Sequence, residues 1–246
     1  MRGGWRILLA GLALCAVATS SPRAQTLTAD LSSHVIGITT GFAGADLVLF
    51  GSTDRPGDVV VVVRGPATTM LIRKKKKVLG IWINGRSTTF RDAPTFYEAA
   101  ANRPIEEIAA PETLARYGIG LDNIHLQPPA TDPDLAPFRA ALVGNQERAD
   151  LYRREVAHVT FLGEHLFRTD IGFPANVPTG NYTVEVILLA GGQVLSAQTT
   201  PLIVSRIGFS NGVFAVANQH AAVYGAGALA FAVAAGWAAG AIFRRV

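Results

Sequence analysis

The feature that most constrains this chain is an uncharged stretch close to its C-terminus. Residues 221–243 form a run of 23 positions without a charged side chain, and Arg244 and Arg245 follow directly. A helix of that length, at about 1.5 Å per residue, can cross the roughly 30 Å hydrocarbon core of a bilayer. Basic residues mark the cytoplasmic end of such a span. The sequence therefore predicts one transmembrane helix over 221–243 and a cytoplasmic tail over 244–246.

The predicted span is rich in small residues. Fifteen of its 23 positions are Ala or Gly. Gly236 and Gly240 have the GxxxG spacing with which two membrane helices pack closely, but so alanine-rich a segment also produces that spacing by composition alone. The helix would lie in membrane lipid, and its small-residue surface suits packing against an integral-membrane partner better than a strong grip on lipid alone. Whether this glycine pair takes part is left open.

The N-terminus predicts export. Arg2 and Arg6 precede an apolar run over residues 7–18, and small residues follow, which is the order of a secretory signal peptide. Cleavage after Ala18 or after Ala24 fits this order, and we assign residues 1–24 to the signal peptide. Cys15 is the only cysteine, so the mature chain has no disulfide. We expect a single-pass inner-membrane protein with its bulk in the periplasm and its C-terminus in the cytoplasm.

These topology signals also explain the basic character of the chain. The sequence has 22 Lys and Arg against 18 Asp and Glu. Five of the arginines lie in the predicted signal region or the cytoplasmic tail, which leaves 17 basic and 18 acidic side chains in the exported part. A nearly neutral exported domain gives no electrostatic support for nucleic-acid binding.

The exported part, residues 25–206, is long enough for one domain and is dominated by strand patterns. The five consecutive valines from Val59 to Val63 predict a strand buried on both faces. Lys74, Lys75, Lys76 and Lys77 are interpreted as the loop between two strands, and Asn84-Gly85 as the next tight turn. The expected strands are 27–31, 35–39, 45–50, 58–64, 68–73, 78–84, 156–162, 182–188, 194–199 and 202–206.

Helical patterns interrupt these strands over residues 92–155. Helices are predicted over 104–108 and 111–118, where a proline begins each and acidic residues occupy the first turn, and over 138–155. Tyr182, near the start of a late strand, resembles the tyrosine that fixes a corner in immunoglobulin-like sandwiches, although no cysteine follows two residues later. The predicted fold is mainly β with a helical insertion (α+β): an immunoglobulin-like β-sandwich, a juxtamembrane segment over 207–220, and the transmembrane helix.

The chain also resembles a known family, the alphaproteobacterial "putative transmembrane protein" family. The resemblance rests on the residues 80–84, on Phe96-Tyr97, on the residues 103–108, and on Gly180 and Tyr182 before a C-terminal anchor. It implies a signal peptide, a periplasmic domain and a membrane anchor, but no catalytic signature. The family is associated with sulfite-exporter-type permeases, which implies an accessory role in transport.

Two groups of residues are candidate binding sites. Arg73, Lys74, Lys75, Lys76 and Lys77 could form a patch for anions or lipid headgroups, or a solvated hairpin tip that blocks strand pairing, and we favour the latter. The second candidate is a ligand cleft. The alternative, which we favour, is that Trp82 is a core residue on a strand and Asn84 only begins a turn. The cleft would be lined by Trp82, Asn84, Phe96, Tyr97 and Arg103.

Catalytic and metal-binding patterns are weak. Glu155 and His158 have the Glu-x-x-His spacing, and Glu164 and His165 follow, but a helical di-metal site needs two such motifs and further carboxylates. We predict no metal and no cofactor. The sequence favours a non-catalytic accessory or binding protein; the alternative is an anchored periplasmic hydrolase that uses carboxylates or a metal. A cleft that joins His125, His158 or His165 to nearby acids would favour the enzyme.

Overall fold

The computed structural model describes residues 27–78, 80–128 and 135–207, together with 225, 229, 232–237 and 240. The predicted signal peptide and most of the predicted span over 221–243 lie outside these residues. Over the part of the chain that is described, no helix combines the length and apolar character that crossing a membrane requires.

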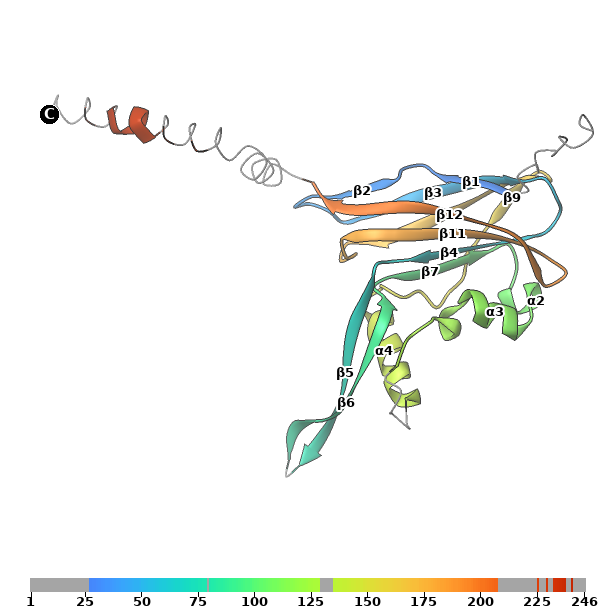
Figure 1. Ribbon diagram of the computed structural model, residues 1–246, viewed down its shortest axis with the longest axis horizontal. Coiled ribbons are helices and arrows are strands. Elements are labelled where there is room, and N and C mark those ends of the chain that lie inside the picture. Colours follow the sequence, from blue (N-terminus) through green and yellow to red (C-terminus); the bar gives the residue numbers. More distant parts are fainter. Residues whose placement is uncertain are drawn as a thin grey trace, which may run out of the picture.

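Two sheets pack face to face as a β-sandwich (Figure 1). The smaller sheet has the order β1 (Leu27–Leu31), β3 (Gly44–Thr53), β10 (Leu166–Pro174), β9 (Thr160–Leu162). The larger sheet has the order β2 (Val35–Ile38), β12 (Gln193–Arg206), β11 (Gly180–Ala190), β4 (Asp58–Arg64), β7 (Tyr97–Ala101), β8 (Ala157–His158). Within the larger sheet, β2 runs parallel to β12 and β7 parallel to β8, and the other neighbours are antiparallel.

The valine run of β4 is buried on both faces, as its sequence predicts. Val59, Val61 and Val63 belong to the core between the two sheets. Val60 and Val62 belong to a second core on the opposite face of the larger sheet. Successive side chains of a strand point to opposite faces, so β4 needs apolar residues at every position.

Helices cover that opposite face and make the molecule three layers deep (Figure 1). They are α2 (Ile105–Ile108), α3 (Pro111–Tyr117), the 3-10 turn η2 (Leu121–Asn123) and α4 (Ala136–Arg148). Helix α3 begins at Pro111 and ends at Tyr117. Gly118 caps it with a φ of 61°, the left-handed conformation that a glycine adopts without strain. This confirms the prediction for 111–118.

The prediction of a helix over 138–155 is wrong in its second half. Helix α4 ends at Arg148, because Asp150 adopts a left-handed φ of 56° and turns the chain back toward β7. The predicted helical segment, 92–155, also contributes β7 to the larger sheet. Neither β7 nor β10 was expected as a strand from the sequence.

A long hairpin, which we call the arm, leaves the sandwich between β4 and β7 (Figure 1). It consists of β5 (Ala67–Val78) and β6 (Ile81–Pro94), paired from Ala67↔Pro94 to Val78↔Ile81. The lysine run therefore lies within β5, and Asn84-Gly85 lies within β6, so the predicted loop and the predicted turn are both wrong. The chain reverses instead beside Gly80, where φ is 85°.

Strands β11 and β12 contain the strands expected over 182–188 and 194–199 and pair as a hairpin. Gly191 and Gly192 turn the chain with φ of 58° and 79°. At the other end of β11, the Tyr182 hydroxyl donates a hydrogen bond of 2.6 Å to the Pro178 carbonyl, the bond expected of a tyrosine corner. β12 is one strand, although two strands separated at residues 200–201 were predicted. Pro201 pairs with β11 but lies outside the part of β12 that pairs with β2, so the strand continues through a proline that has no amide hydrogen to donate.

Candidate functional site

A polar cavity of about 740 Å³ opens where β7 and β8 meet the segment that follows α4. Ligand sites in proteins are commonly cavities of this size with a few converging polar groups. The cavity is lined by Glu98, Glu147, Asp150, Tyr152, Arg153, Arg154, Glu155, Val156, Ala157, His158 and Pro174.

The segment after α4 is held against the edge of β7. The Tyr97 amide donates to the Leu151 carbonyl at 2.9 Å, and the Arg153 amide donates to the Tyr97 carbonyl at 3.0 Å. The Tyr152 hydroxyl anchors the same segment by donating to the Pro94 carbonyl at 2.6 Å. These bonds place Arg153 beside Glu98, which follows Tyr97 in β7.

Glu98 is a carboxylate in an apolar strand. All five residues of β7 are buried, and Glu98 retains only 2% of its exposure. By strand alternation it shares the inward face with Phe96 and Ala100, whose side chains lie in the core between the sheets. Its Oε1 atom accepts a hydrogen bond of 3.3 Å from Arg153 Nη1, while Oε2 has no hydrogen-bond partner among the described atoms.

Burial governs the protonation of this carboxyl. Loss of hydration raises the pKa of Glu98 to about 7, and the nearby carboxylate of Asp46 adds to the rise. The Arg153 guanidinium and the Gly172 amide favour the ionised form but offset only part of that effect. Glu98 therefore changes between its protonated and its ionised form near neutral pH.

Two other ionisable groups of the cavity lining, Glu147 and Arg154, pair with each other. Arg154 donates to Glu147 at 2.6 Å and lies 3.5 Å from Asp122. His158 and Glu155 both line the cavity, so the Glu-x-x-His pair from the sequence does reach this site.

His125 and His165 are not part of the cavity lining. His165 Nδ1 lies 2.8 Å from the Thr53 carbonyl, and His125 Nε2 lies 2.7 Å from the Ala115 carbonyl. Within the described residues, no group of three His, Cys, Asp or Glu side chains is arranged to hold a metal ion.

The five residues of the predicted ligand cleft are not brought together. Trp82 and Asn84 are exposed on the arm, and Trp82 retains 65% of its exposure, so Trp82 is not a core residue either. Phe96 and Tyr97 are fully buried in different cores on opposite faces of the larger sheet. Arg103 lies at the surface and donates to Asp58 at 2.6 Å and 2.7 Å.

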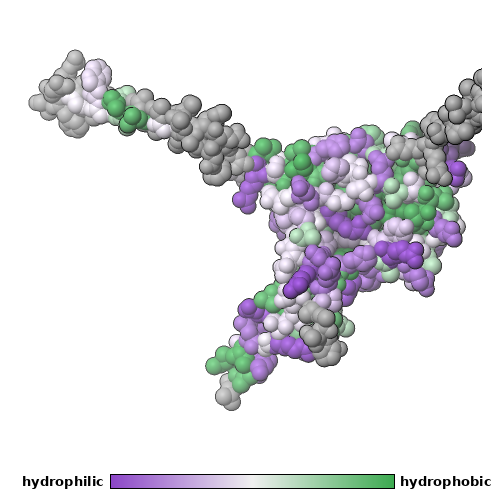
Figure 2. All heavy atoms as spheres, viewed as in Figure 1, coloured by the Kyte–Doolittle hydropathy of each residue, from purple (hydrophilic) through white to green (hydrophobic). Residues whose placement is uncertain are grey.

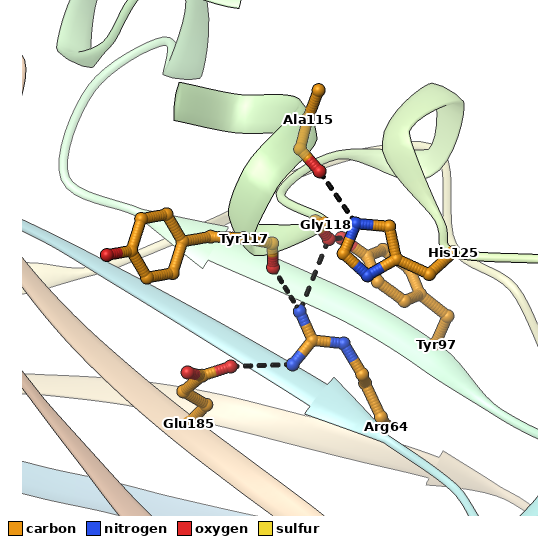
Figure 3. Close-up of polar contacts among 7 residues, drawn as sticks. All are labelled: Arg64, Tyr97, Ala115, Tyr117, Gly118, His125 and Glu185. Carbon is orange, nitrogen blue, oxygen red and sulfur yellow. Dashed lines mark hydrogen bonds and ion pairs between the residues drawn. The ribbon is translucent and has the colours of Figure 1, made fainter. Parts of the chain in front are cut away.

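Arg64 forms a second polar cluster at the C-terminal end of α3 (Figure 3). Its Nη1 atom donates to Glu185 at 2.6 Å, and Nη2 donates to the carbonyls of Tyr117 and Gly118. The Tyr97 hydroxyl donates to the same Gly118 carbonyl at 2.9 Å. A cation at the carbonyl end of a helix is stabilising, so this cluster joins α3 to the larger sheet.

The sequence analysis did not identify Glu98 or Arg153 as site residues. The available signal is the single charge of Glu98 within the apolar run over residues 96–101. A buried charge is costly unless it is paired, so such a residue suggests a functional position. Arg153 leaves no comparable signal, because its role depends on where α4 ends.

The fold and the cavity define a β-sandwich protein with a helical layer on one sheet and a buried carboxylate at the mouth of a polar cavity. Comparison with known protein families identifies the family to which this sandwich protein belongs. The family described as "Putative transmembrane protein (Alph_Pro_TM)" matches residues 26–245. The chain belongs to this family, which confirms the resemblance stated from the sequence at that level. No curated protein matches the chain.

Proposed function

We propose that this protein is a membrane-anchored periplasmic accessory protein that binds a ligand or a membrane partner without catalysing a reaction. In this proposal, residues 1–24 direct export and residues 221–243 anchor the domain in the inner membrane. Membership of a family of transmembrane proteins supports the membrane location. The hydrogen bond from Tyr182 to Pro178 supports an immunoglobulin-like type of sandwich, a fold common among binding domains.

The observation that carries the proposal is the arrangement of Glu98 and Arg153 at the polar cavity. The cavity is lined by one buried carboxyl, whose Oε2 atom has no hydrogen-bond partner among the described residues, next to an arginine that reaches the surface. The arginine would bind an acceptor group of a ligand, and the carboxyl behind it would fix the position of the guanidinium. Such an arrangement supports reversible binding. Assistance to a sulfite-exporter-type permease is the specific form that the family association suggests.

Co-purification of the full chain from gently solubilised membranes tests this proposal. We expect a specific integral-membrane partner to be recovered, and Glu98→Gln with Arg153→Ala to reduce its recovery. Arg168→Ala is the matched control, because Arg168 makes only an exposed contact with Asp170 on the smaller sheet. Repeated recovery of the protein without a partner would contradict the proposal. So would an equal yield of the partner from the Glu98→Gln, Arg153→Ala double variant and from the Arg168→Ala control.

The alternative is an anchored hydrolase that uses a carboxylate. Two observations favour it. The cavity brings His158 together with the acids Glu98 and Glu155, which is the arrangement expected of an enzyme. The pKa of Glu98 near 7 would also suit a general acid or base at neutral pH. A screen of ester, phosphate and glycoside substrates with the full chain tests this alternative. Activity that is lost in Glu98→Gln and kept in Arg168→Ala would support the enzyme over the binding protein.

A further inference from the structure

The arm carries a large share of the positive charge of the exported part. The arm, residues 67–94, contains seven Lys and Arg and one Asp, and it includes all four lysines of the chain. The other exported residues hold ten basic and seventeen acidic side chains. The arm is therefore strongly cationic on a domain that is otherwise acidic, and Arg73 and the four lysines are exposed on it.

The end of the arm is apolar as well as basic (Figure 2). Val78 pairs with Ile81, and Lys76 pairs with Ile83, so one face of the ribbon presents Val78, Ile81 and Ile83 around a single lysine. The other face presents Trp82 beside Lys75 and Lys77, by the pairs Lys77↔Trp82 and Lys75↔Asn84. All four apolar side chains are exposed, and Ile81 retains 68% of its exposure.

Packing at its base holds the arm away from the sandwich. Phe90 is buried in the core beneath the helices, and Met70 and Ile72 pack against that core. Arg86 lies over the Phe138 ring of α4, 5.1 Å from its centre. Apolar contacts therefore stabilise the half of the arm next to the sandwich. The apolar side chains at the far end of the arm remain exposed and are available to bind another surface.

The base of the arm and the end of β12 lie at the same end of the larger sheet. Pro66 packs against Gly180, and Gly180 pairs with Val204, two residues before β12 ends. The predicted juxtamembrane segment over 207–220 can extend to at most roughly 50 Å. The twelve residues of β5 span roughly 40 Å. The bilayer that holds the predicted anchor is thus within reach of the arm.

We propose that the arm docks on the surface of an anionic bilayer, with Val78, Ile81, Trp82 and Ile83 in the boundary between headgroups and acyl chains and the lysines on lipid phosphates. Tryptophan with an aliphatic cluster suits this boundary, and each basic side chain near an anionic surface strengthens binding roughly fivefold. An acidic protein would satisfy the lysines but would not require this exposed aliphatic end. The inference is independent of the polar cavity and its ligand.

The position of Trp82 in the bilayer tests this inference. The full chain, with Trp5→Phe and Trp237→Phe so that Trp82 is the sole tryptophan, is reconstituted into vesicles of phosphatidylcholine alone or mixed with phosphatidylglycerol. Brominated acyl chains quench tryptophan only within the bilayer. We expect quenching in the mixed vesicles, at least a tenfold weaker effect after all four lysines are changed to glutamine, and weakening at high salt.

The matched control changes Arg55, Arg116 and Arg168, exposed arginines of the sandwich and helical layers, to glutamine. We expect this three-arginine variant to leave the quenching of Trp82 unchanged. Thermal unfolding checks that the four-lysine variant and the three-arginine variant are both folded. Absence of quenching in mixed vesicles would overturn the inference, as would equal quenching with and without the lysines. Cross-linking of the arm to an acidic protein, with Trp82 unquenched by lipid, would also overturn it.

Discussion

Arg153 Nη1 lies 3.3 Å from Glu98 Oε1, although the two residues are 55 positions apart in the sequence. The carboxyl side chain is 3% exposed and the arginine side chain 41% exposed, so the pair connects the interior of the sandwich to its surface. Desolvation of the carboxylate outweighs its attraction to the arginine, and the native pKa of Glu98 is raised. Several measurable properties follow from this pair and from the packing around it.

The stability of the protein should fall as pH rises through the range in which Glu98 titrates. The pKa of Glu98 is about 7 in the native state against 4.5 for the free side chain. Between these values the native state holds a proton that the unfolded state has released, so this contribution is complete below about pH 4.5 and lost above about pH 7. The loss amounts to about 3 kcal/mol.

Urea unfolding of the full chain in detergent at pH 5 and pH 8 measures this effect. Glu98→Gln should remove most of the difference between the two pH values that the wild-type protein shows. If the variant and the wild-type protein show the same dependence on pH, Glu98 is not the titrating group.

Arg153→Ala should destabilise the protein by about 1–2 kcal/mol at pH 8, because it leaves a buried ionised carboxylate without its partner. The cost should be smaller at pH 5, where Glu98 is protonated and needs the arginine less. Arg168→Ala serves as the control and should change the free energy of unfolding by less than about 0.5 kcal/mol at either pH. A cost for Arg153→Ala that does not depend on pH would contradict the assignment.

Tyr182→Phe should lower the free energy of unfolding by about 1 kcal/mol, since the buried ring stays and only its bond to the Pro178 carbonyl is lost. Tyr117→Phe is the comparison, because Tyr117 binds Arg64 through its main-chain carbonyl, which the substitution keeps. Equal stabilities of the two variants in urea unfolding would show that the corner bond contributes nothing.

Val60→Ala and Val61→Ala should each destabilise the protein by about 2 kcal/mol, because each removes methyl groups from a different core. Val35→Ala, at an edge position that is 51% exposed, should be nearly neutral. Without a helical layer over the larger sheet, Val60 would face solvent and Val60→Ala would also be nearly neutral. A nearly neutral Val60→Ala would therefore contradict the second core.

Much of the sandwich could be predicted from local sequence. Strands β1 and β4 have their predicted ends, and the uninterrupted valines of β4 indicated burial on both faces. The glycine pair after β11 and the proline that begins α3 also had local signals. In each of these cases the conformation depends on residues close in the sequence, which is the kind of information that a pattern carries.

The arm and the site could not be predicted in the same way. Charged residues usually mark loops, but Lys74–Lys77 lie in a strand because their partners in β6 hold the backbone and the side chains are in solvent. Glu98 and Arg153 meet only because Asp150 ends α4 and turns the following segment toward β7. These relationships depend on tertiary contacts that no local pattern contains.

The most direct test of the account is the side of the membrane on which the arm lies. All four lysines of the chain are consecutive on β5, so a membrane-impermeant amine reagent followed by peptide mapping identifies the arm without any substitution. Applied to intact alphaproteobacterial spheroplasts, the reagent should modify the peptide that contains Lys74, while a cytoplasmic control protein stays unmodified. Modification of that peptide only after the spheroplasts are lysed would contradict export of the domain, and with it both proposals.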